Sequence, residues 1–260
     1  MFYRKILNLL TICTLFFAAS YPQNQEQSIY ADYFHRANEL YKKDKFEEAL
    51  TLYKKIPNPG AVVSYDMGNC AYKQSNYGYA LAYWRRAERN LGLIGGSELL
   101  NNIKLLKNKL HESSANAKEK YKNEAFLQKI QNLRIYFEFF IHSTPLLFLQ
   151  LVFLLLWVLA FLFIRNLFRT KRKSLILLLF TTIAIFGLIL VIKYNFEIKE
   201  HGVVVSKNAN LYSGPGQNYQ VLCFIPEASE VVIEKAVDGF FKIKINGQNG
   251  WIDQSSVEKF

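Results

Sequence analysis

The residue types that most often carry catalysis or bind metal ions are scattered through this 260-residue chain. The histidines, His35, His111, His142 and His201, have no accompanying carboxylate arrangement near them in the sequence. Beyond residue 20 the cysteines, Cys70 and Cys223, lie far apart and have no second ligand at metal-site spacing. The sequence also lacks a phosphate-binding loop and the Gly-x-Ser-x-Gly and HExxH motifs. We therefore expect no enzyme activity, no cofactor and no metal site; a triad of residues distant in sequence is the remaining route to catalysis.

Amide and ammonium side chains recur at equal spacing in the N-terminal part of the chain. Asn38 and Lys42 are followed 31 residues later by Asn69 and Lys73. Side chains of these types on a helix can hold the backbone or a carboxylate of a bound peptide. We predict that these four residues line a groove for a protein partner; the alternative is ordinary solvated surface.

Aromatic residues are prominent in the C-terminal part of the chain. We predict that four of them form a recognition patch for a peptide: Tyr212, Tyr219, Phe240 and Trp251. Aromatic rings combine a large apolar face with little conformational entropy to lose on binding. The alternative is packing in the core and at its rim, which is favoured for Trp251 and for one of Phe240 and Phe241.

The amide and ammonium residues belong to an internal repeat. Residues 33–56 and 64–87 align with small and aromatic residues in the same places, at Ala37/Gly68, Tyr41/Tyr72, Phe46/Tyr77, Ala49/Ala80 and Tyr53/Trp84. This pattern resembles the tetratricopeptide repeat, whose usual period is about 34 residues. The resemblance implies a helical repeat domain over residues 21–112, capped by a helix that carries Leu99 to Leu110. Such domains bind protein segments on a concave surface.

Residues 193–260 alternate short β-branched runs with turn residues, which predicts a small all-β SH3-like barrel. The expected strands are Val203–Val205, Gln220–Ile225, Glu230–Glu234, Phe240–Ile245 and Gly250–Ile252. Asn246 and Gly247 predict a hairpin turn before the last of them.

Three short motifs make this part similar to the bacterial SH3 family: NLYSGPG at 210–216, GFFKI at 239–243 and GWI at 250–252. The family commonly has Arg where this chain has Tyr212, so the ligand contact of that Arg is in doubt here. The resemblance implies binding of peptides or of cell-wall peptidoglycan outside the cytoplasm.

Two apolar segments without charges, 145–164 and 174–192, are each long enough to cross a bilayer. About 20 helical residues, at a rise of about 1.5 Å each, span the hydrocarbon core. The link between them, residues 165–173, carries the cations Arg165, Arg169, Lys171, Arg172 and Lys173. The positive-inside rule places this link in the cytoplasm and residues 21–144 and 193–260 on the outer side.

Composition agrees with a folded membrane protein. Hydrophobic residues make up 51% of the chain and charged residues 20%, which excludes a disordered or collagen-like protein. The net charge of +11 (32 − 21) is densest in the link between the two apolar segments. A basic link of this kind indicates a membrane protein, and we expect no nucleic-acid binding.

Two further segments flank the predicted repeat domain. Residues 1–20 predict a secretory signal peptide with Arg4 and Lys5 before a short apolar run; the alternative is an uncleaved anchor. Residues 113–144 predict a linker followed by a juxtamembrane helix. That helix either lies amphipathically at the membrane surface or extends the first span.

The order of these parts resembles the BatE component of the Bat aerotolerance group. The resemblance implies a complex with other membrane proteins in the bacterial envelope. We predict a multidomain protein of the bacterial inner membrane, with its N- and C-terminal domains in the periplasm. The leading hypothesis is an adaptor whose repeat domain binds protein partners. The alternative is a protein that binds or senses cell-wall peptide through its SH3-like domain.

Overall fold

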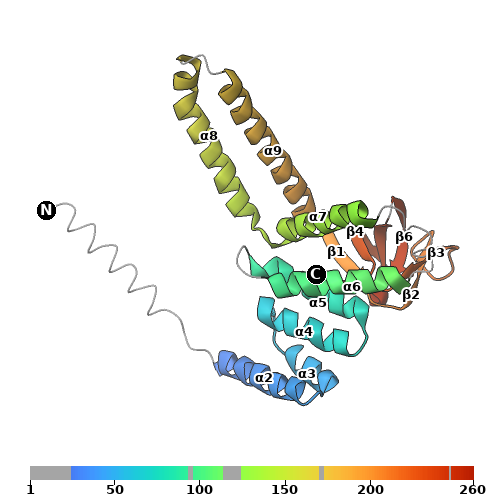
Figure 1. The fold of residues 1–260 in the computed structure, drawn as a ribbon. Helices are drawn as coiled ribbons and strands as arrows, with labels where there is room; N and C mark the ends of the chain where they lie inside the picture. Colours follow the sequence, from blue (N-terminus) through green and yellow to red (C-terminus); the bar gives the residue numbers. More distant parts are fainter. Residues whose placement is uncertain (1–24, 93–95, 114–123, 170–172, 246) are drawn as a thin grey trace. The chain divides into compact units, whose positions relative to one another are not determined.

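The computed structural model describes residues 25–92, 96–113, 124–169, 173–245 and 247–260. The chain divides into two compact units, one up to Pro57 and one from Asn58 onward, and each is considered by itself (Figure 1). Residues 1–20, for which the sequence predicts a signal peptide, lie outside the described residues.

Each unit contains one helical hairpin of the predicted repeat. The first is formed by α2 (Gln25–Lys42) and α3 (Phe46–Tyr53), the second by α4 (Ala61–Lys73) and α5 (Tyr77–Leu91). Both hairpins turn with the same backbone geometry, because Asp44 and Ser75 have φ values of 59° and 61°. In each case the N–H of this residue donates to the carbonyl three residues earlier. The repeat in the sequence is therefore also a repeat in local backbone structure.

Small residues in both hairpins occupy equivalent buried positions. Ala37 and Ala49 are fully buried in the first hairpin, and Gly68 and Ala80 are buried in the second. A Cβ atom added at Gly68 would overlap the indole ring of Trp84. The larger aromatic residue in the second repeat thus requires a glycine where the first repeat has an alanine.

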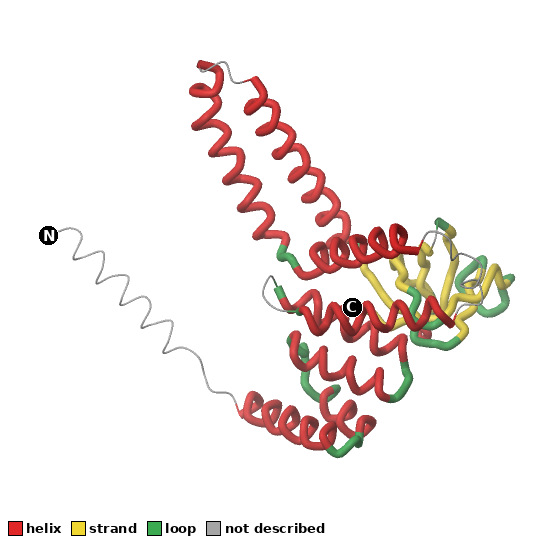
Figure 2. The backbone as a smooth tube through the Cα atoms, viewed as in Figure 1, coloured by secondary structure: helices red, strands yellow, loops and turns green. Residues whose placement is uncertain are grey.

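The second unit continues with α6 (Ser97–Ser113) and α7 (Glu124–Ser143), both of which pack against α5. The chain then bends by 95° between Leu133–Ser143 and the start of α8 (Leu146–Arg169). After α8, the chain returns along it in α9 (Lys173–Ile198), and Figure 2 shows the two helices as a hairpin.

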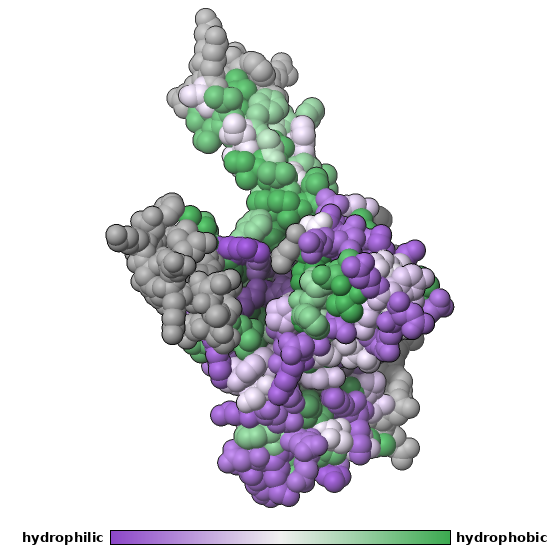
Figure 3. All heavy atoms as spheres, turned by 90° about the vertical axis from the view of Figure 1, so that its right-hand side faces the viewer, coloured by the Kyte–Doolittle hydropathy of each residue, from purple (hydrophilic) through white to green (hydrophobic). Residues whose placement is uncertain are grey.

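The α8–α9 hairpin is the most apolar part of the described chain. Over Ser174–Ile198, α9 is long and apolar enough to cross a membrane. The segment Leu146–Leu162 of α8 is long and apolar enough only when it is taken together with Leu133–Ser143 on the other side of the bend. The described residues therefore hold one helix that could cross a membrane, or two if the bent pair is one span. Figure 3 shows hydrophobic residues over the hairpin.

Both helices are longer than the apolar segments read from the sequence. Helix α8 continues to Arg169 and α9 begins at Lys173, so most of the expected link 165–173 is helical. Helix α9 also runs to Ile198, past the expected end at residue 192. These stretches contain no proline or glycine that would stop a helix, and Arg and Lys are good helix formers.

From Glu200 onward the chain forms an antiparallel sheet, here called the β-domain. Its strands are β1 (Glu200–Val204), β2 (Asn208–Tyr212), β3 (Val221–Pro226), β4 (Glu230–Val237), β5 (Phe240–Ile245), β6 (Gln248–Asp253) and β7 (Val257–Lys259). Their order is β3-β2-β6-β5-β4-β1-β7. The fully buried side chains of Leu211, Ile243 and Ile252 are at the centre of its core.

Two of these strands were not expected from the sequence. The β2 segment, NANLY, is rich in residues with low β-propensity, and β7 has only three residues. Alternating burial and pairing with β3 and β6 nevertheless place β2 within the sheet. The predicted turn joins β5 to β6, with Gly247 at φ +84°; Asn246 lies outside the described residues.

Candidate functional site

Three of the four predicted aromatic residues lie together on one side of the β-domain. Tyr212 of β2 is directly opposite Trp251 of β6, and directly opposite residues project from the same face of a sheet. The ring of Tyr212 meets that of Phe240 of β5 edge-on, with centroids 5.9 Å apart. Phe240 is buried, whereas Tyr212 and Trp251 are half-buried. Phe240 therefore supports the half-buried ring of Tyr212.

Lysine side chains lie around these rings. The Nζ of Lys235 is 5.3 Å from the centroid of the Trp251 ring, a cation–π distance. Lys242 is the strand neighbour of both Trp251 and Lys235, and its Nζ is 2.9 Å from a carboxylate oxygen of Glu234. We call Tyr212, Lys235, Phe240, Lys242 and Trp251 the aromatic–basic face. Such a face suits an extended ligand with apolar and anionic groups.

The fourth predicted aromatic residue, Tyr219, is placed differently. It lies in the loop between β2 and β3, and about half of it is exposed. Its ring covers Gly214 and Gly216, and a Cβ at Gly214 would overlap it. Tyr219 therefore shapes the loop that carries the SGPG sequence.

The predicted groove residues divide into two kinds. Asn38 accepts a hydrogen bond from the hydroxyl of Tyr53, and Asn69 accepts one from the indole N–H of Trp84 at 3.2 Å. Both bonds join residues 15 apart, so the two repeats use the same interaction. Lys42 and Lys73 are exposed. The amide oxygens thus hold the helices of each hairpin together, and the lysines face solvent.

Replacing Asn69 with Ala should destabilise the second hairpin by about 1–3 kcal/mol, because it leaves the buried indole N–H of Trp84 without its acceptor. Chemical unfolding of the full chain in detergent, followed by tryptophan fluorescence, measures this loss. The exposed Lys73→Ala, on the same helix, serves as the matched control and should change stability by less than about 0.5 kcal/mol. Equal effects of the two variants would contradict a structural role for Asn69.

The sequence did not point to a cluster of ionisable residues, buried or half-buried, between α5, α6, α7 and β4. Its members are Arg85, Glu88, Lys107, Glu138, His142 and Glu230, and we call it the Arg85 cluster. Arg85 donates to Glu88 at 2.6 Å and to Glu230 at 2.9 Å. The Nζ of Lys107 is 3.1 Å from oxygens of both Glu138 and Glu230. The cluster therefore joins the repeat helix α5 to the β-domain and to α7.

Burial and pairing set the charge states in this cluster. Arg85 is 2% exposed and Glu88 is 0% exposed. Burial alone would lower the pKa of Arg85, but Glu230 and Glu88 raise it above its usual value. Burial would raise the pKa of Glu230, but Arg85 and Lys107 hold it well below the usual range. Arg85 and Glu230 are therefore ionised throughout the physiological pH range.

A column of stacked rings continues from the cluster. His142 stacks on Phe196 with centroids 4.3 Å apart, and Phe196 stacks on His201 at 4.1 Å. The Nδ1 of His142 is 2.9 Å from Glu88 and 3.1 Å from Arg85. Burial lowers the pKa of both histidines below the ordinary value of 6.5. Both rings are therefore neutral at pH 7.

We expect stability to fall as the pH is lowered from 7 to 5. In the unfolded chain the two histidines bind protons below about pH 6.5, whereas the folded chain resists protonation. Their contribution is therefore complete above pH 6.5 and is lost as the pH falls through the lowered folded values. Melting temperatures from pH 5 to 8 test this, and the variant His142→Asn/His201→Asn should show a smaller decrease. A decrease as large as that of the original chain would exclude these residues as its cause.

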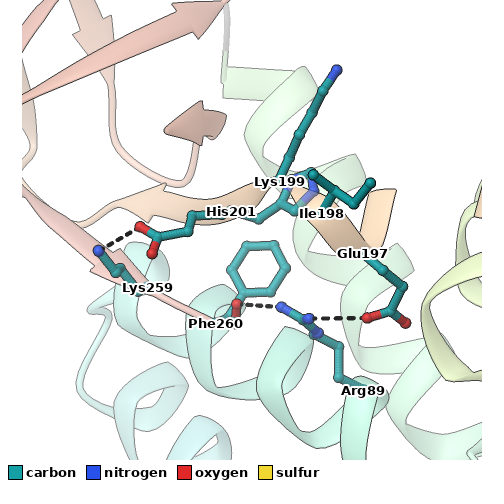
Figure 4. A pocket seen from close by; sticks show the side chains of 8 residues that line it. Arg89, Glu197, Ile198, Lys199, His201, Lys259 and Phe260 are labelled. Atoms are coloured by element: carbon teal, nitrogen blue, oxygen red, sulfur yellow. Dashed lines mark hydrogen bonds and ion pairs between the residues drawn. The ribbon is translucent and has the colours of Figure 1, made fainter. Parts of the chain in front are cut away.

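A second set of contacts lies where α9 passes into β1. Helix α9 ends at Ile198 and β1 begins at Glu200, with Lys199 alone between them. Arg89 of α5 donates to the backbone oxygen of Phe260 at 2.7 Å and pairs with Glu197 at 3.6 Å. These residues line an open pocket of about 260 Å³ together with His201 and Lys259 (Figure 4). Arg89 pairs there with Glu197 and Lys259 pairs with Glu200, so this is a structural junction.

The Arg85 cluster was missed because its partners are distant in sequence. Glu230 lies 145 residues from Arg85 and His142 lies 57 residues from it. The local signal is the pair Arg85 and Glu88, three residues apart on a helix that is otherwise buried on most sides. A charged pair among buried positions indicates an ion pair inside the protein, but it does not identify the other members.

The cations expected to set the membrane topology lie at the connection of α8 and α9. Arg165 and Arg169 belong to α8, and Lys173 is the first residue of α9. Lys171 and Arg172 lie outside the described residues. In the part of the chain that is described, no group of three or more His, Cys, Asp or Glu side chains could hold a metal ion.

Comparison with known proteins identifies one part of the chain. Residues 207–258 match the family model of the bacterial SH3 domain. No match to a curated protein was found. The β-domain is therefore a bacterial SH3 domain, as the motifs at 210–216, 239–243 and 250–252 predicted. The helices lie outside the matched residues, so the tetratricopeptide and BatE resemblances remain predictions.

Proposed function

We propose that this protein is a membrane-anchored adaptor without enzymatic activity that binds other proteins of the bacterial envelope. The observation that carries the proposal is the Arg85 cluster, which joins α5, α6, α7 and the SH3 domain within one unit. The same unit contains the apolar α8–α9 hairpin. In this proposal the buried ionic connection holds the SH3 domain, with its aromatic–basic face, against α5 and α7 of the same unit.

We place the anchor in the bacterial inner membrane, with both α8 and α9 as spans. The cations between the two helices favour a cytoplasmic position for their connection, which leaves the SH3 domain and the helical hairpins in the periplasm. Accessibility of single cysteines to a membrane-impermeant thiol reagent in intact cells tests this arrangement. Labelling at residue 171 but not at residue 207 would overturn it.

The protein-binding residues that we favour are Lys42 in the first unit and Lys73 in the second, each at the equivalent exposed place of its own hairpin. In vivo crosslinking followed by purification of the full chain tests it. Lys42→Glu/Lys73→Glu should lose the crosslinked partners, because the charge reversal repels a carboxylate ligand. The charge-matched control Lys104→Glu/Lys207→Glu should keep them. Unchanged recovery with the first variant would remove these residues from the binding surface.

Membership of a Bat-type aerotolerance complex is the specific form of this proposal. It is supported by the order of the parts, in which helical hairpins, two apolar helices and a bacterial SH3 domain follow one another. Von Willebrand-type membrane proteins are the expected partners in such a complex. Their absence from the crosslinked material would argue against this form of the adaptor.

The second candidate function is the binding of cell-wall peptide, and the aromatic–basic face favours it. The rings of Tyr212 and Trp251 offer stacking surfaces, and Lys235 beside Trp251 can meet a carboxylate, whereas Lys242 is paired with Glu234. The full chain in detergent should sediment with purified cell wall. Trp251→Ala should weaken this binding by at least about tenfold, because the loss of a central aromatic residue often has an effect of this size. Lys235→Glu should act in the same direction, and Tyr219→Ala should not. Failure of the original chain to sediment would exclude this candidate and leave the adaptor.

A further inference from the structure

Helix α7 exposes an apolar face, whereas a helix on a water-soluble protein usually exposes a polar one. Its outer face is formed by Ile130, Leu133, Tyr136, Phe137 and Phe140, which are between 39% and 70% exposed. These residues recur every three or four positions and therefore lie on one face of the helix. Five large exposed apolar residues on one face of a helix are uncommon on a protein surface in water.

Polar side chains of α7 lie on its inner face, and the exposed Arg134 pairs with one of them, Glu138, at 2.8 Å. Glu138 and His142 belong to the Arg85 cluster. Ile135 is also buried. Phe139 fills the space beside Gly96, where a Cβ would come within 2.6 Å of its ring. Because the inner face is held by ion pairs, α7 cannot turn its apolar face inward without breaking the cluster.

The outer face is continuous with the apolar surface of the α8–α9 hairpin. Helix α8 begins three residues after α7 ends, at an angle of 95°, and its exposed residues include Leu147 and Leu151. Lys193 of α9 donates to the carbonyl of Ile141 at 2.7 Å and so fixes the end of α7 against the hairpin. If α8 follows the membrane normal, α7 lies along the membrane plane.

We propose that the outer face of α7 lies in the lipid interface of the bilayer, beside the point where α8 enters it. This inference rests on the membrane anchoring proposed above. An apolar helix face at this depth, about 5–10 Å into the boundary of headgroups and acyl chains, is removed from water without any protein partner. Tyr136 and the two phenylalanines are residue types that membrane interfaces favour. The occupant of this surface is thus phospholipid, and the buried cluster on the other side of α7 holds the SH3 domain close to the membrane.

Nitroxide labels on the full chain in phosphatidylcholine nanodiscs test this. Labels are introduced singly as Leu133→Cys and Phe137→Cys in a chain whose Cys13, Cys70 and Cys223 are replaced by Ala. The ratio of collisions with oxygen to collisions with a water-soluble nickel complex reports depth in lipid. At residues 133 and 137 we expect a ratio several-fold above that of a label at Val62, an equally exposed apolar residue of α4. It should remain below that of a label at Leu154 in α8.

The alternative occupants give different results. Ratios equal to that at Val62 would mean that α7 faces water, and labels shielded from both reagents would mean that a protein covers it; either result overturns the proposal. A water-like ratio at Leu154 as well would show that the anchoring itself fails. If a label at residue 133 or 137 lowers the melting temperature, Tyr136→Cys on the same face replaces it.

Discussion

Arg85→Met is expected to lower the free energy of unfolding of the second unit by about 3–5 kcal/mol. The substitution removes the cation that pairs with Glu88 and Glu230 and leaves the fully buried Glu88 carboxylate without it. Methionine keeps much of the side-chain volume, so the loss reports charge and not a cavity. Denaturant unfolding of the full chain in detergent, followed by the fluorescence of the neighbouring Trp84, measures it.

Two further variants make this result specific. Arg36→Met removes an exposed ion pair with Asp32, four residues away on α2, and should cost at most about 0.5 kcal/mol. Arg85→Met/Glu88→Leu replaces the buried pair by apolar side chains and should recover part of the loss, since no unpaired charge remains at residue 88. A loss below about 1 kcal/mol for Arg85→Met alone would mean that the cluster does not hold the unit together.

Gly78→Ala is expected to separate the SH3 domain from α5 while leaving the helix intact. A Cβ at this position would lie 2.5 Å from the carbonyl oxygen of Val204 and 2.7 Å from the Cα of Val205, both of which are backbone atoms. The backbone cannot move aside as a flexible side chain could, so the domain must shift. The hydrogen bond from the Gly78 N–H to Glu227, at 2.7 Å, would be lost with it. Alanine favours the helical state over glycine by about 1 kcal/mol, so α5 itself should not suffer.

Hydrogen exchange of the full chain measures this separation. The amide of residue 78, whose acceptor is Glu227, should exchange at least about tenfold faster, which corresponds to a loss of about 1.4 kcal/mol in local stability. The core amides of β5 should be unchanged. Gly60→Ala is the matched control, because a Cβ there meets no atom within 4 Å. Unchanged exchange at this amide would show that the contact between α5 and the SH3 domain at Gly78 is absent in solution.

The elements of this chain could be predicted from local patterns, because their stabilising features are local. The repeat of small and aromatic residues predicted two helical hairpins, and both have the same turn at Asp44 and Ser75. The motifs around Gly214 and Trp251 predicted the SH3 domain, which the family match confirms. The strand β2 was missed because its pairing with β3 and β6 outweighs the low β-propensity of its asparagines.

The candidate site could be predicted only where its residues belong to a sequence motif or to the repeat. Tyr212, Phe240 and Trp251 meet because neighbouring strands bring the three motif segments together. Asn38 and Asn69 could be paired by the repeat, but their bonds to Tyr53 and Trp84 require the packed hairpin. The Arg85 cluster depends on contacts between four elements, and only the positions of those elements in space define it.

The connection between α9 and the SH3 domain has a mechanical consequence. A single residue, Lys199, separates the helix from β1, and the interactions of Phe196 and Glu197 with residues of other elements leave this joint little freedom. If α9 spans the bilayer as proposed above, it tilts in a thinner bilayer to keep its apolar length within the hydrocarbon. With a joint this short, any such tilt must rotate the whole SH3 domain by a similar angle. The orientation of the domain would then depend on the thickness of the surrounding bilayer.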